Sequence, residues 1–555
     1  MPSGRPLPAS APATRWLWLA FGLITLWRLA AAWLLPVTQD EAYYIDWASR
    51  LDWGYFDHPP GVALLALGSW LAPTSALAGR LGNLLAATLT LALLIRFYRA
   101  CGLDPKQQFL ALVVTAATFG GLVSGVLATP DTPLALAWVL ALTEGLAALR
   151  GDRRRWVTAG LATGLGLLGK YGMALIGPVF LWAILWADPK ALRTPWPYLG
   201  ALAALLVFAP NLAWNAQNDW LSLRFQFGHG FSTTAGVADA VTGAVMALPE
   251  RTSPLAQADL AERLVAVLGF LGIQAALWGL ILLPLLMALW QAIRRYGGRD
   301  ASHGASAGRP AGVHPGAPAQ QAQALVSHAS PAVGRPVAVR ALLVAGTVFP
   351  LGFFALVAAF SPVQPNWAIL YLVTAVPLLV AGLGKFARSL LVTAGINLLL
   401  VSVYVFHART GLLPLPDKQQ RILYETHGFA ALAAELAVLP GPVFADRYQL
   451  VAMMRFYAPG LEITQWPGLF RPSEYLRGRL RPLADPEAVA RAGGFWLLSR
   501  DPYRPAIHGF RLDRQRVLYD CLHQGPREAL ADQPEPCTAP IHRWWLVRYV
   551  PAPTA

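Results

Sequence analysis

Thr38-Gln39-Asp40-Glu41-Ala42-Tyr43-Tyr44 is a short polar block between two long apolar stretches, and Gly54-Tyr55-Phe56-Asp57-His58-Pro59-Pro60 follows it closely. The Asp40–Glu41 pair comes just after the first apolar run, so it places two carboxylates at a boundary between water and lipid. Charge at such a boundary is costly unless it serves a function. The block is therefore the first place to look for a catalytic carboxylate.

The composition indicates a polytopic membrane protein. Of the 555 residues, 55% are hydrophobic and 13% are charged, whereas soluble domains carry about 25% charge. The net charge of +14 could suggest nucleic-acid binding. The basic residues gather instead in short segments between apolar runs, which is the pattern of cytoplasmic loops in membrane proteins. We therefore do not expect a nucleic-acid partner.

Eleven apolar runs are candidates for membrane-spanning helices. They lie at residues 16–36, 77–99, 107–128, 132–149, 156–170, 173–187, 197–214, 264–293, 341–360, 366–384 and 388–406. The shorter run at 61–72 fits a helix that lies in the membrane interface within the first outer loop. Residues 1–15 are expected to be a cytoplasmic tail before an uncleaved first span.

After the N-terminal tail at residues 1–15, two domains follow from this pattern. Residues 16–406 form an all-α transmembrane domain, in which residues 297–340 are expected to be a disordered cytoplasmic linker rich in Ala, Gly and Pro. Residues 407–555 become more polar, with expected strands at 443–446, 495–499 and 544–550, and predict a small α/β domain on the outer side. Threading the spans from a cytoplasmic N-terminus places the basic clusters inside and the polar blocks outside.

The C-terminal region also carries Cys521 and Cys537, two of the three cysteines. An oxidising compartment permits a disulfide. If this domain lies outside the cytoplasm, the two could pair. Two unpaired thiols remain an equally weighted alternative.

Asp40 and Glu41 are the main catalytic candidates. As neighbours on a helix they diverge by about 100°, so they need not share one role. One of them could act as a general base while the other orients it or binds a polar acceptor. The alternative is an acid pair that stabilises the start of an interfacial helix through its dipole.

Other polar residues near the outer ends of the spans are weaker candidates. Lys170 interrupts an apolar segment and could neutralise a lipid phosphate, as could Arg80. Asp131 fits ordinary helix capping as well as a site. Arg28, inside the first span, is a candidate for a structural pair with Glu144.

Two further sets complete the candidates. Asp57 and His58 precede two prolines that stiffen the chain; His58 could contact a phosphate or join Asp57 at a metal ion, and the alternative is a simple turn. Possible acceptor or sugar contacts are Tyr43, Tyr55, Trp214, Asn215 and Trp367. Interfacial aromatic belts explain many aromatic residues at span ends without a ligand.

The blocks at residues 39–41 and 54–60 resemble the membrane glycosyltransferases of the GT-C superfamily, which include protein mannosyltransferases and lipid A aminoarabinose transferases. Thr129-Pro130-Asp131, Gly169-Lys170-Tyr171 and Trp214-Asn215 are similar and follow in the same order. So does Pro365-Asn366-Trp367. The resemblance covers most of residues 16–400 and leaves the C-terminal domain aside.

The resemblance implies an inverting transferase that uses a polyprenyl-phosphate sugar at the periplasmic face of the inner membrane. The resemblance also implies that Asp40 is the catalytic base or a close partner of the base, with Glu41 next to it. It implies that Asp131 is a second acid that lines the cavity. Lys170 is a phosphate contact. His58 replaces a Lys of the aminoarabinose transferases, and Asp57 stands where their Glu approaches a metal.

We therefore predict a glycosyltransferase that moves a sugar to a hydroxyl of a lipid, glycan or protein acceptor. No cofactor is expected to be required, and a divalent metal stays an open alternative. The rival hypothesis is a transporter or lipid flippase, which also uses intramembrane charge. No pair of related halves, typical of many transporters, is visible in the sequence. A structural scaffold for the outer domain is a third reading.

Overall fold

The computed structural model describes residues 11–231, 258–291, 334–380, 382–416, 419–502, 504–529, 536–537 and 539–553. Two predicted segments overlap helices of the described residues. α1 (Ala11–Leu34) includes residues 11–15 of the predicted tail, whose cytoplasmic location stays a prediction. The predicted linker at 297–340 lies outside the described residues up to 333, and its last part belongs to α16 (Gly334–Ala358).

Long apolar helices make this chain a multi-pass membrane protein. Six helices of the described residues are long and apolar enough to span a bilayer, or seven if one bent pair counts as a single span. The six contain α1, α4 (Ala76–Ala100), α7 (Asp131–Leu149), α10 (Trp196–Gln217), α16 and α18 (Ala387–Thr410). The total of eleven spans stays a prediction.

Several predicted runs form shorter or broken helices. The run at 107–128 divides into α5 (Pro105–Ala117) and α6 (Phe119–Val123), because Thr118 is extended and its hydroxyl caps the new helix at Gly121. The run at 264–293 bends by 99° between α13 (Leu260–Ala276) and the helix Gly279–Gln291. The remaining short pieces are α8 (Arg155–Gly169), α9 (Ile176–Ala187), α11 (Leu221–Phe231) and α17 (Leu372–Val380), with 3₁₀ turns η2 (Tyr171–Leu175), η3 (Pro189–Arg193), η4 (Gly279–Ile281), η5 (Ile369–Tyr371) and η6 (Gly384–Phe386).

The motif loop, which we define as residues 38–60, begins with α2 (Gln39–Trp47). It leads into α3 (Gly61–Leu65) and the 3₁₀ helix η1 (Ala66–Trp70), so the predicted short helix at 61–72 is present. Thr38 is the N-cap of α2, and the Glu41 side chain accepts hydrogen bonds from the Thr38 N–H (3.1 Å) and hydroxyl (3.2 Å). This capping defines where α2 starts.

The C-terminal domain is an α/β unit with a six-stranded sheet in the order β2-β1-β3-β6-β4-β5. The strands are β1 (Val443–Ala445), β2 (Ile463–Gln465), β3 (Phe495–Ser499), β4 (Phe510–Cys521), β5 (Gly525–Ala529) and β6 (His542–Pro551). β1 pairs in parallel with β2 and β3, and the other pairs are antiparallel, with Val443 opposite Trp496 and Leu497 opposite Val547.

Helices α19 (Arg421–Thr426), α20 (Phe429–Ala437), α21 (Tyr448–Tyr457) and α22 (Pro486–Arg491) and the 3₁₀ helix η8 (Glu474–Arg477) accompany the sheet. The predicted strands correspond to β1, β3 and β6, whereas β2, β4 and β5 were not predicted. Cys521, at the end of β4, forms a disulfide with Cys537, so the pairing alternative is confirmed. Cys101 is free.

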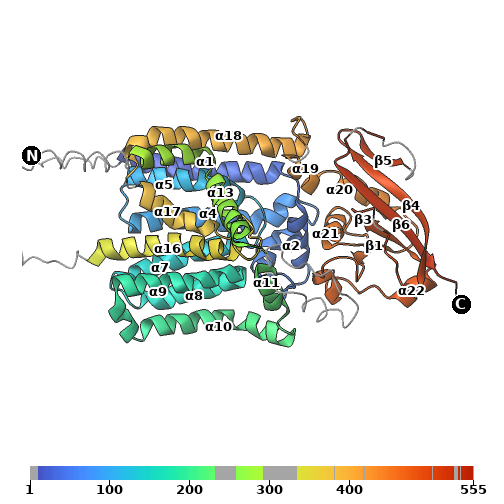
Figure 1. Cartoon of the computed structure of the whole chain (residues 1–555), viewed down its shortest axis with the longest axis horizontal. Coiled ribbons are helices and arrows are strands. Elements are labelled where there is room, and N and C mark those ends of the chain that lie inside the picture. Colours follow the sequence, from blue (N-terminus) through green and yellow to red (C-terminus); the bar gives the residue numbers. More distant parts are fainter. Residues whose placement is uncertain are drawn as a thin grey trace, which may run out of the picture.

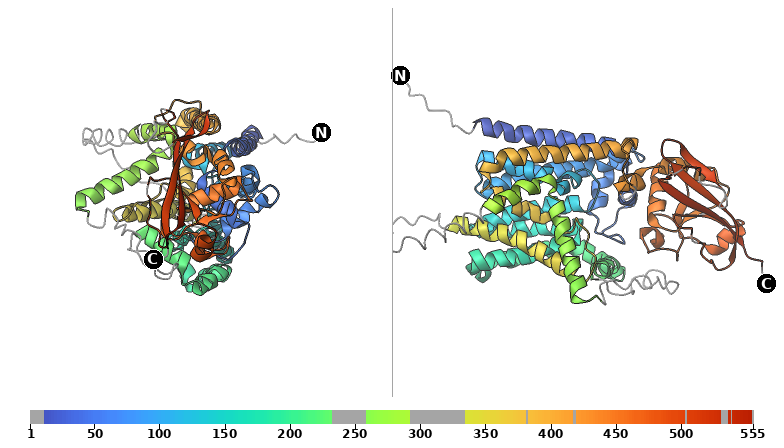
Figure 2. Two further views of the ribbon diagram at one scale, coloured as in Figure 1. Left: turned by 90° about the vertical axis from the view of Figure 1, so that its right-hand side faces the viewer. Right: turned by 45° about the horizontal axis from the view of Figure 1, so that its top comes forward.

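The C-terminal domain lies on one end of the helix bundle, and α2 faces α21 between them (Figure 1). Two further views show the same stacking, with the sheet across the end of the bundle (Figure 2). One hydrophobic core cluster crosses this boundary: it joins Tyr43, Trp47 and Tyr55 of the motif loop to Met453 and Tyr475 of the C-terminal domain. The shared core holds the motif loop against the domain.

Candidate functional site

Glu41 organises the motif loop from its interior. It is fully buried and forms an ion pair with the equally buried Arg80 of α4, through Nε–Oε1 and Nη2–Oε2 contacts of 2.8 and 2.6 Å. Glu41 Oε1 also accepts the Ala128 N–H at 2.7 Å, three residues before Asp131. One carboxylate thus joins the start of α2 to α4 and to the turn before α7.

This geometry corrects two predicted roles. Arg80 donates its remaining hydrogen bonds to the carbonyl oxygens of Ala32, Leu35 and Pro36 at the end of the first span. Arg80 and Glu41 are each 0% exposed, so no polar atom of either residue is left for a substrate. We therefore assign Arg80 to the structure and not to a donor phosphate, and Glu41 to the structure and not to proton transfer.

Asp40 points the other way. Its side chain is exposed, and its Oδ1 accepts a hydrogen bond from the Tyr448 hydroxyl at 3.0 Å. Although the carboxylate keeps contact with solvent, the surrounding protein desolvates it and raises its pKa, while Arg471 and the Tyr448 hydrogen bond oppose that rise. A carboxylate with a raised pKa is better matched to general-base chemistry near neutral pH.

Asp40 is also distinct from the other acids of the motif loop. Among the described residues, each of the other four forms an ion pair within 4 Å, whereas Asp40 forms none. The pairs are Glu41–Arg80, Asp46–Arg455, Asp52–Arg479 and Asp57–Arg471. Three of the four partners come from the C-terminal domain, so that domain neutralises the loop and leaves one acid available.

Asp57 and His58 are held by Arg471 of the C-terminal domain and by Gln226 of α11. Asp57 is 4% exposed, and its Oδ1 accepts a hydrogen bond from Arg471 Nη1 at 2.7 Å. His58 is half-buried, with Nδ1 3.5 Å from the Gln226 side-chain amide of α11. The Gln226 amide also donates to the Asp57 carbonyl at 2.6 Å, which fixes α11 against the motif loop.

The residues around Asp57 do not fit a divalent metal ion. Asp57 Oδ2 is buried without a hydrogen-bond partner among the described residues, which is one unused oxygen donor. A metal needs several such donors. Within the described ranges, no group of three or more His, Cys, Asp or Glu side chains could hold one. The Arg471 guanidinium already supplies positive charge to Asp57.

Glu425, on α19 of the C-terminal domain, is a second acid near Asp40. The Gln39 side chain donates to the Tyr424 carbonyl at 3.0 Å, which places α19 beside the start of α2. Desolvation raises the Glu425 pKa, and the nearby Asp40 charge raises it further. The two carboxylates therefore influence each other's protonation across the domain boundary.

Asp131 and Lys170 form a second polar cluster, at the start of α7 and the end of α8. Lys170 Nζ lies 2.6 Å from Asp131 Oδ1, and the Asn366 amide donates to Asp131 Oδ2 at 2.7 Å. The sequence motifs around these three residues therefore meet in space. The Ala128–Glu41 hydrogen bond connects this cluster to α2.

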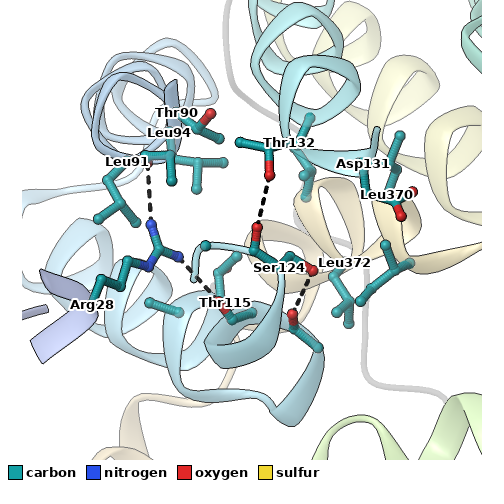
Figure 3. Close-up of a pocket in the computed structure, with 18 residues that line it drawn as sticks. Arg28, Thr90, Leu91, Leu94, Thr115, Ser124, Asp131, Thr132, Leu370 and Leu372 are labelled. Atoms are coloured by element: carbon teal, nitrogen blue, oxygen red, sulfur yellow. Dashed lines mark hydrogen bonds between the residues drawn. The ribbon is translucent and has the colours of Figure 1, made fainter. Parts of the chain in front are cut away.

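A cavity of about 80 Å³ lies next to Asp131. Figure 3 shows Arg28 and Asp131 on opposite sides of it, and Leu91 and Leu372 are among the apolar side chains that line it. Arg28 donates to the carbonyl oxygens of Ala87 and Gly121, each at 3.1 Å. The predicted Arg28–Glu144 pair is wrong, because Glu144 pairs with Arg96 and Arg155 instead.

Most of the residues predicted to contact a sugar are structural. Tyr43 is 1% exposed, and its hydroxyl accepts the Glu474 N–H at 2.7 Å. Tyr55 is fully buried and stacks on Trp47 at 4.3 Å. These rings form the core under the motif loop, so the predicted sugar contacts at Tyr43 and Tyr55 are corrected.

The same holds for Trp214 and Asn215 at the end of α10. Trp214 is 5% exposed, and its indole N–H donates to Asp52 Oδ2 at 2.5 Å. Asn215 is fully buried and donates to the Tyr171 hydroxyl and to Asn211. Burial keeps both from a sugar. Trp367 is half-buried, with its ring 6.0 Å from that of Phe354, and its sugar contact stays a prediction.

The C-terminal domain contributes functional candidates that sequence reasoning missed, namely Tyr448, Arg471, Glu425 and Glu474. Buried Glu474 accepts the Phe56 N–H at 2.8 Å, and desolvation raises its pKa to about 7 in spite of Arg477. No motif marks these residues. The available signal in the sequence was the pair of consecutive acids, Asp40 and Glu41, because two adjacent carboxylates need stabilising groups from elsewhere in the chain.

Comparison with known proteins gives matches in both sequence and fold. A family model described as dolichyl-phosphate-mannose-protein mannosyltransferase matches residues 57–214. An undecaprenyl phosphate-alpha-4-amino-4-deoxy-L-arabinose arabinosyl transferase of Sodalis glossinidius is 30% identical over 166 residues, which is 29% of this chain and 30% of the relative. A lipid A galacturonosyltransferase of Rhizobium johnstonii is 29% identical over 192 residues, or 33% of this chain and 40% of the relative.

The chain thus spans less than half the length of these two relatives in the matched regions. The fold agrees over a longer stretch. The crystal structure of ArnT from Cupriavidus metallidurans in the apo state has a TM-score of 0.57 and 14% identity, covering 97% of this chain and 98% of that chain. Its complex with undecaprenyl phosphate has a TM-score of 0.55. The resemblance to the GT-C superfamily of membrane glycosyltransferases is therefore confirmed, in sequence over residues 57–214 and in fold over nearly the whole chain.

Proposed function

We propose that this protein transfers a sugar from a polyprenyl-phosphate donor to a hydroxyl group of an envelope acceptor, with inversion at the anomeric carbon. One observation carries the proposal: Asp40 is the acid of the motif loop that stays exposed and without an ion pair among the described residues. The names of two relatives, an arabinosyl and a galacturonosyl transferase, support the class of reaction. One neighbour in fold was crystallised with undecaprenyl phosphate, which supports a prenyl-linked donor.

In the proposed reaction the acceptor oxygen attacks the anomeric carbon while the bond from that carbon to the phosphate oxygen breaks. The products are the glycosylated acceptor and the polyprenyl monophosphate. Asp40 takes the proton of the acceptor hydroxyl, and Tyr448, 3.0 Å away, orients the carboxylate. Lys170 and His58 are proposed to stabilise the phosphate as it leaves, with Asp131 holding the Lys170 ammonium in position.

We infer that the reaction takes place at the periplasmic face of the inner membrane. The helix α2, which carries Asp40, and the C-terminal domain lie at one end of the bundle (Figure 1). The Cys521–Cys537 disulfide supports an oxidising compartment for that end. The acceptor remains a lipid, a glycan or a protein, and the lipid A relative favours a lipid.

The test is transfer from a labelled undecaprenyl-phosphate sugar by the purified protein in nanodiscs. Asp40→Asn should lower turnover by about 10²–10⁴-fold, which is the usual contribution of a general base. Asp219→Asn is the matched control, because Asp219 is an exposed acid outside the site. Transfer by Asp40→Asn at the wild-type rate would reject Asp40 as the base. Movement of the lipid across the bilayer without release of its sugar would favour the rival hypothesis of a transporter or lipid flippase.

A further inference from the structure

Arg471 is a cation that the C-terminal domain places against the motif loop. Its Nη1 donates to Asp57 Oδ1 at 2.7 Å and more weakly to the Pro472 carbonyl at 3.4 Å. The guanidinium lies over two aromatic rings, at 4.2 Å from the centre of Tyr448 and 5.1 Å from that of Phe225. Thirty per cent of the side chain remains exposed, so it is held firmly but stays open to a ligand.

Arg471 and the proposed base share one neighbour. The Tyr448 ring packs under the guanidinium, and the Tyr448 hydroxyl donates to Asp40. Tyr448 therefore contacts both the carboxylate and the guanidinium. In a displacement at a sugar carbon, the base and the cation that receives the leaving group must flank the sugar. The shared contact with Tyr448 brings both groups to one part of the candidate site.

The chemistry of the guanidinium suits a phosphate. Arginine presents five N–H donors in a planar fork that matches phosphate oxygens in pairs, and it stays charged in a protein. Asp57 is also nearly buried, so the pair is held in one orientation. A positive charge fixed in this way can stabilise charge that develops on a leaving phosphate without rearranging.

We propose that Arg471 binds the phosphate of the polyprenyl-phosphate donor, so that a guanidinium supplies beside Asp57 the positive charge that a divalent metal ion would otherwise supply. This inference rests on the proposed function. It predicts that the reaction proceeds without a divalent metal. It also gives the C-terminal domain a catalytic task, in addition to its contacts with the loop.

The main alternative is an ion pair that only fastens the two domains. Asp46–Arg455 is such a pair, with contacts of 2.6 and 2.7 Å in the same interface, and provides the control. In nanodiscs, binding of farnesyl phosphate and farnesol is measured by calorimetry for wild type, Arg471→Met, Arg471→Lys and Arg455→Met. We expect Arg471→Met to weaken farnesyl phosphate binding by roughly 10–100-fold, as for a lost charged hydrogen bond, and to leave farnesol unchanged.

Arg471→Lys keeps the positive charge but loses the paired N–H donors of the guanidinium, so its affinity for farnesyl phosphate should lie between those of the wild type and Arg471→Met. Arg455→Met should bind farnesyl phosphate as the wild type does. Equal affinity in Arg471→Met and wild type, at a similar melting temperature, would overturn the proposal. If Arg471→Met is too unstable to purify, the Arg471→Lys affinity decides: an unchanged value contradicts the phosphate role, and a reduced value supports it.

A double variant separates a fastening role from phosphate binding. Asp57→Asn combined with Arg471→Met removes both charges, so a simple fastening pair would be relieved and wild-type binding would return. We expect binding to stay weak. Wild-type transfer should also persist in EDTA, and a loss that added magnesium restores would refute the metal-free reaction. These results are distinct from failure of the proposed function, in which the wild type itself transfers no sugar.

Discussion

The motif loop and the surface of the C-terminal domain that covers it form two halves of the candidate site, yet they differ in how they are built. The motif loop is compact in sequence, and its acids lie within residues 38–60. Its partners are spread over about 50 residues of the C-terminal domain, from Glu425 to Arg479, on helices, loops and a 3₁₀ turn. A loop rich in carboxylates can therefore receive its ion-pair and hydrogen-bond partners from a surface that carries no recognisable sequence motif.

The comparison also applies within the loop, where two neighbouring carboxylates have opposite environments. Glu41 faces inward to Arg80, and Asp40 faces the C-terminal domain. Both are acids, and both follow the N-cap of α2. Only their neighbours in space separate the structural residue from the proposed base.

The largest expected effect comes from breaking the inner pair. Glu41→Gln leaves the buried Arg80 without a counter-charge, and breaking a buried ion pair in this way costs about 3–5 kcal/mol. Asp40→Asn, by contrast, should leave stability unchanged or slightly higher, since it removes a desolvated charge. Thermal unfolding in detergent compares the two variants. A fully stable Glu41→Gln variant would show that this pair does not hold the loop.

The next effect concerns the other half of the site. Tyr448→Phe removes the hydrogen bond to Asp40, and a bond to a charged group contributes about 1.5–3 kcal/mol, or roughly 10–100-fold in the rate of sugar transfer. Steady-state transfer in nanodiscs measures it. Tyr519→Phe, on the distant strand β4, is the control and should keep the wild-type rate. A wild-type rate in Tyr448→Phe would show that the hydrogen bond from the C-terminal domain to Asp40 does not contribute to transfer.

A smaller effect is expected where the loop packs on the bundle. A Cβ atom at Gly54 would lie 2.4 Å from the Trp214 ring, which is too close for unstrained packing. Gly54→Ala should therefore lower stability by about 1–3 kcal/mol through overpacking. Gly172→Ala, where a Cβ meets nothing within 4 Å, is the matched control. Equal melting temperatures of the two variants would show that Trp214 moves freely.

The smallest expected effect is a shift in the dependence of transfer on pH. Desolvation raises the Asp40 pKa. Because the proposed base must be ionised to accept a proton, the rate of transfer is highest at high pH and falls as the pH drops through that raised pKa. The Tyr448 hydrogen bond lowers the same pKa. Tyr448→Phe should therefore move the acid limb upward by less than about one unit. The measurement is kcat/KM from about pH 4 to about pH 8, and a downward shift would contradict the assignment.

Much of the fold could be predicted from the sequence, because long apolar runs and alternating strands report burial directly. The long helices, the short helix after the motif loop and strands β1, β3 and β6 follow from such patterns. The broken helices could not be predicted, since a cap such as Thr118 at Gly121 resembles any other threonine in an apolar run. β2 was missed because it is short, and β4 because charged residues interrupt its apolar pattern.

The sequence by itself determined that this chain spans a membrane, and it predicted that the polar blocks lie at one end of the bundle and that neighbouring acids mark the candidate site. Helical spacing also required Asp40 and Glu41 to point in different directions. Only the tertiary structure decided which acid is buried against Arg80, and that Tyr448 and Arg471 complete the other side. The reason is physical: ion pairing and desolvation depend on neighbours in space, and Tyr448 and Arg471 lie about 400 residues along the chain from the acids that they contact.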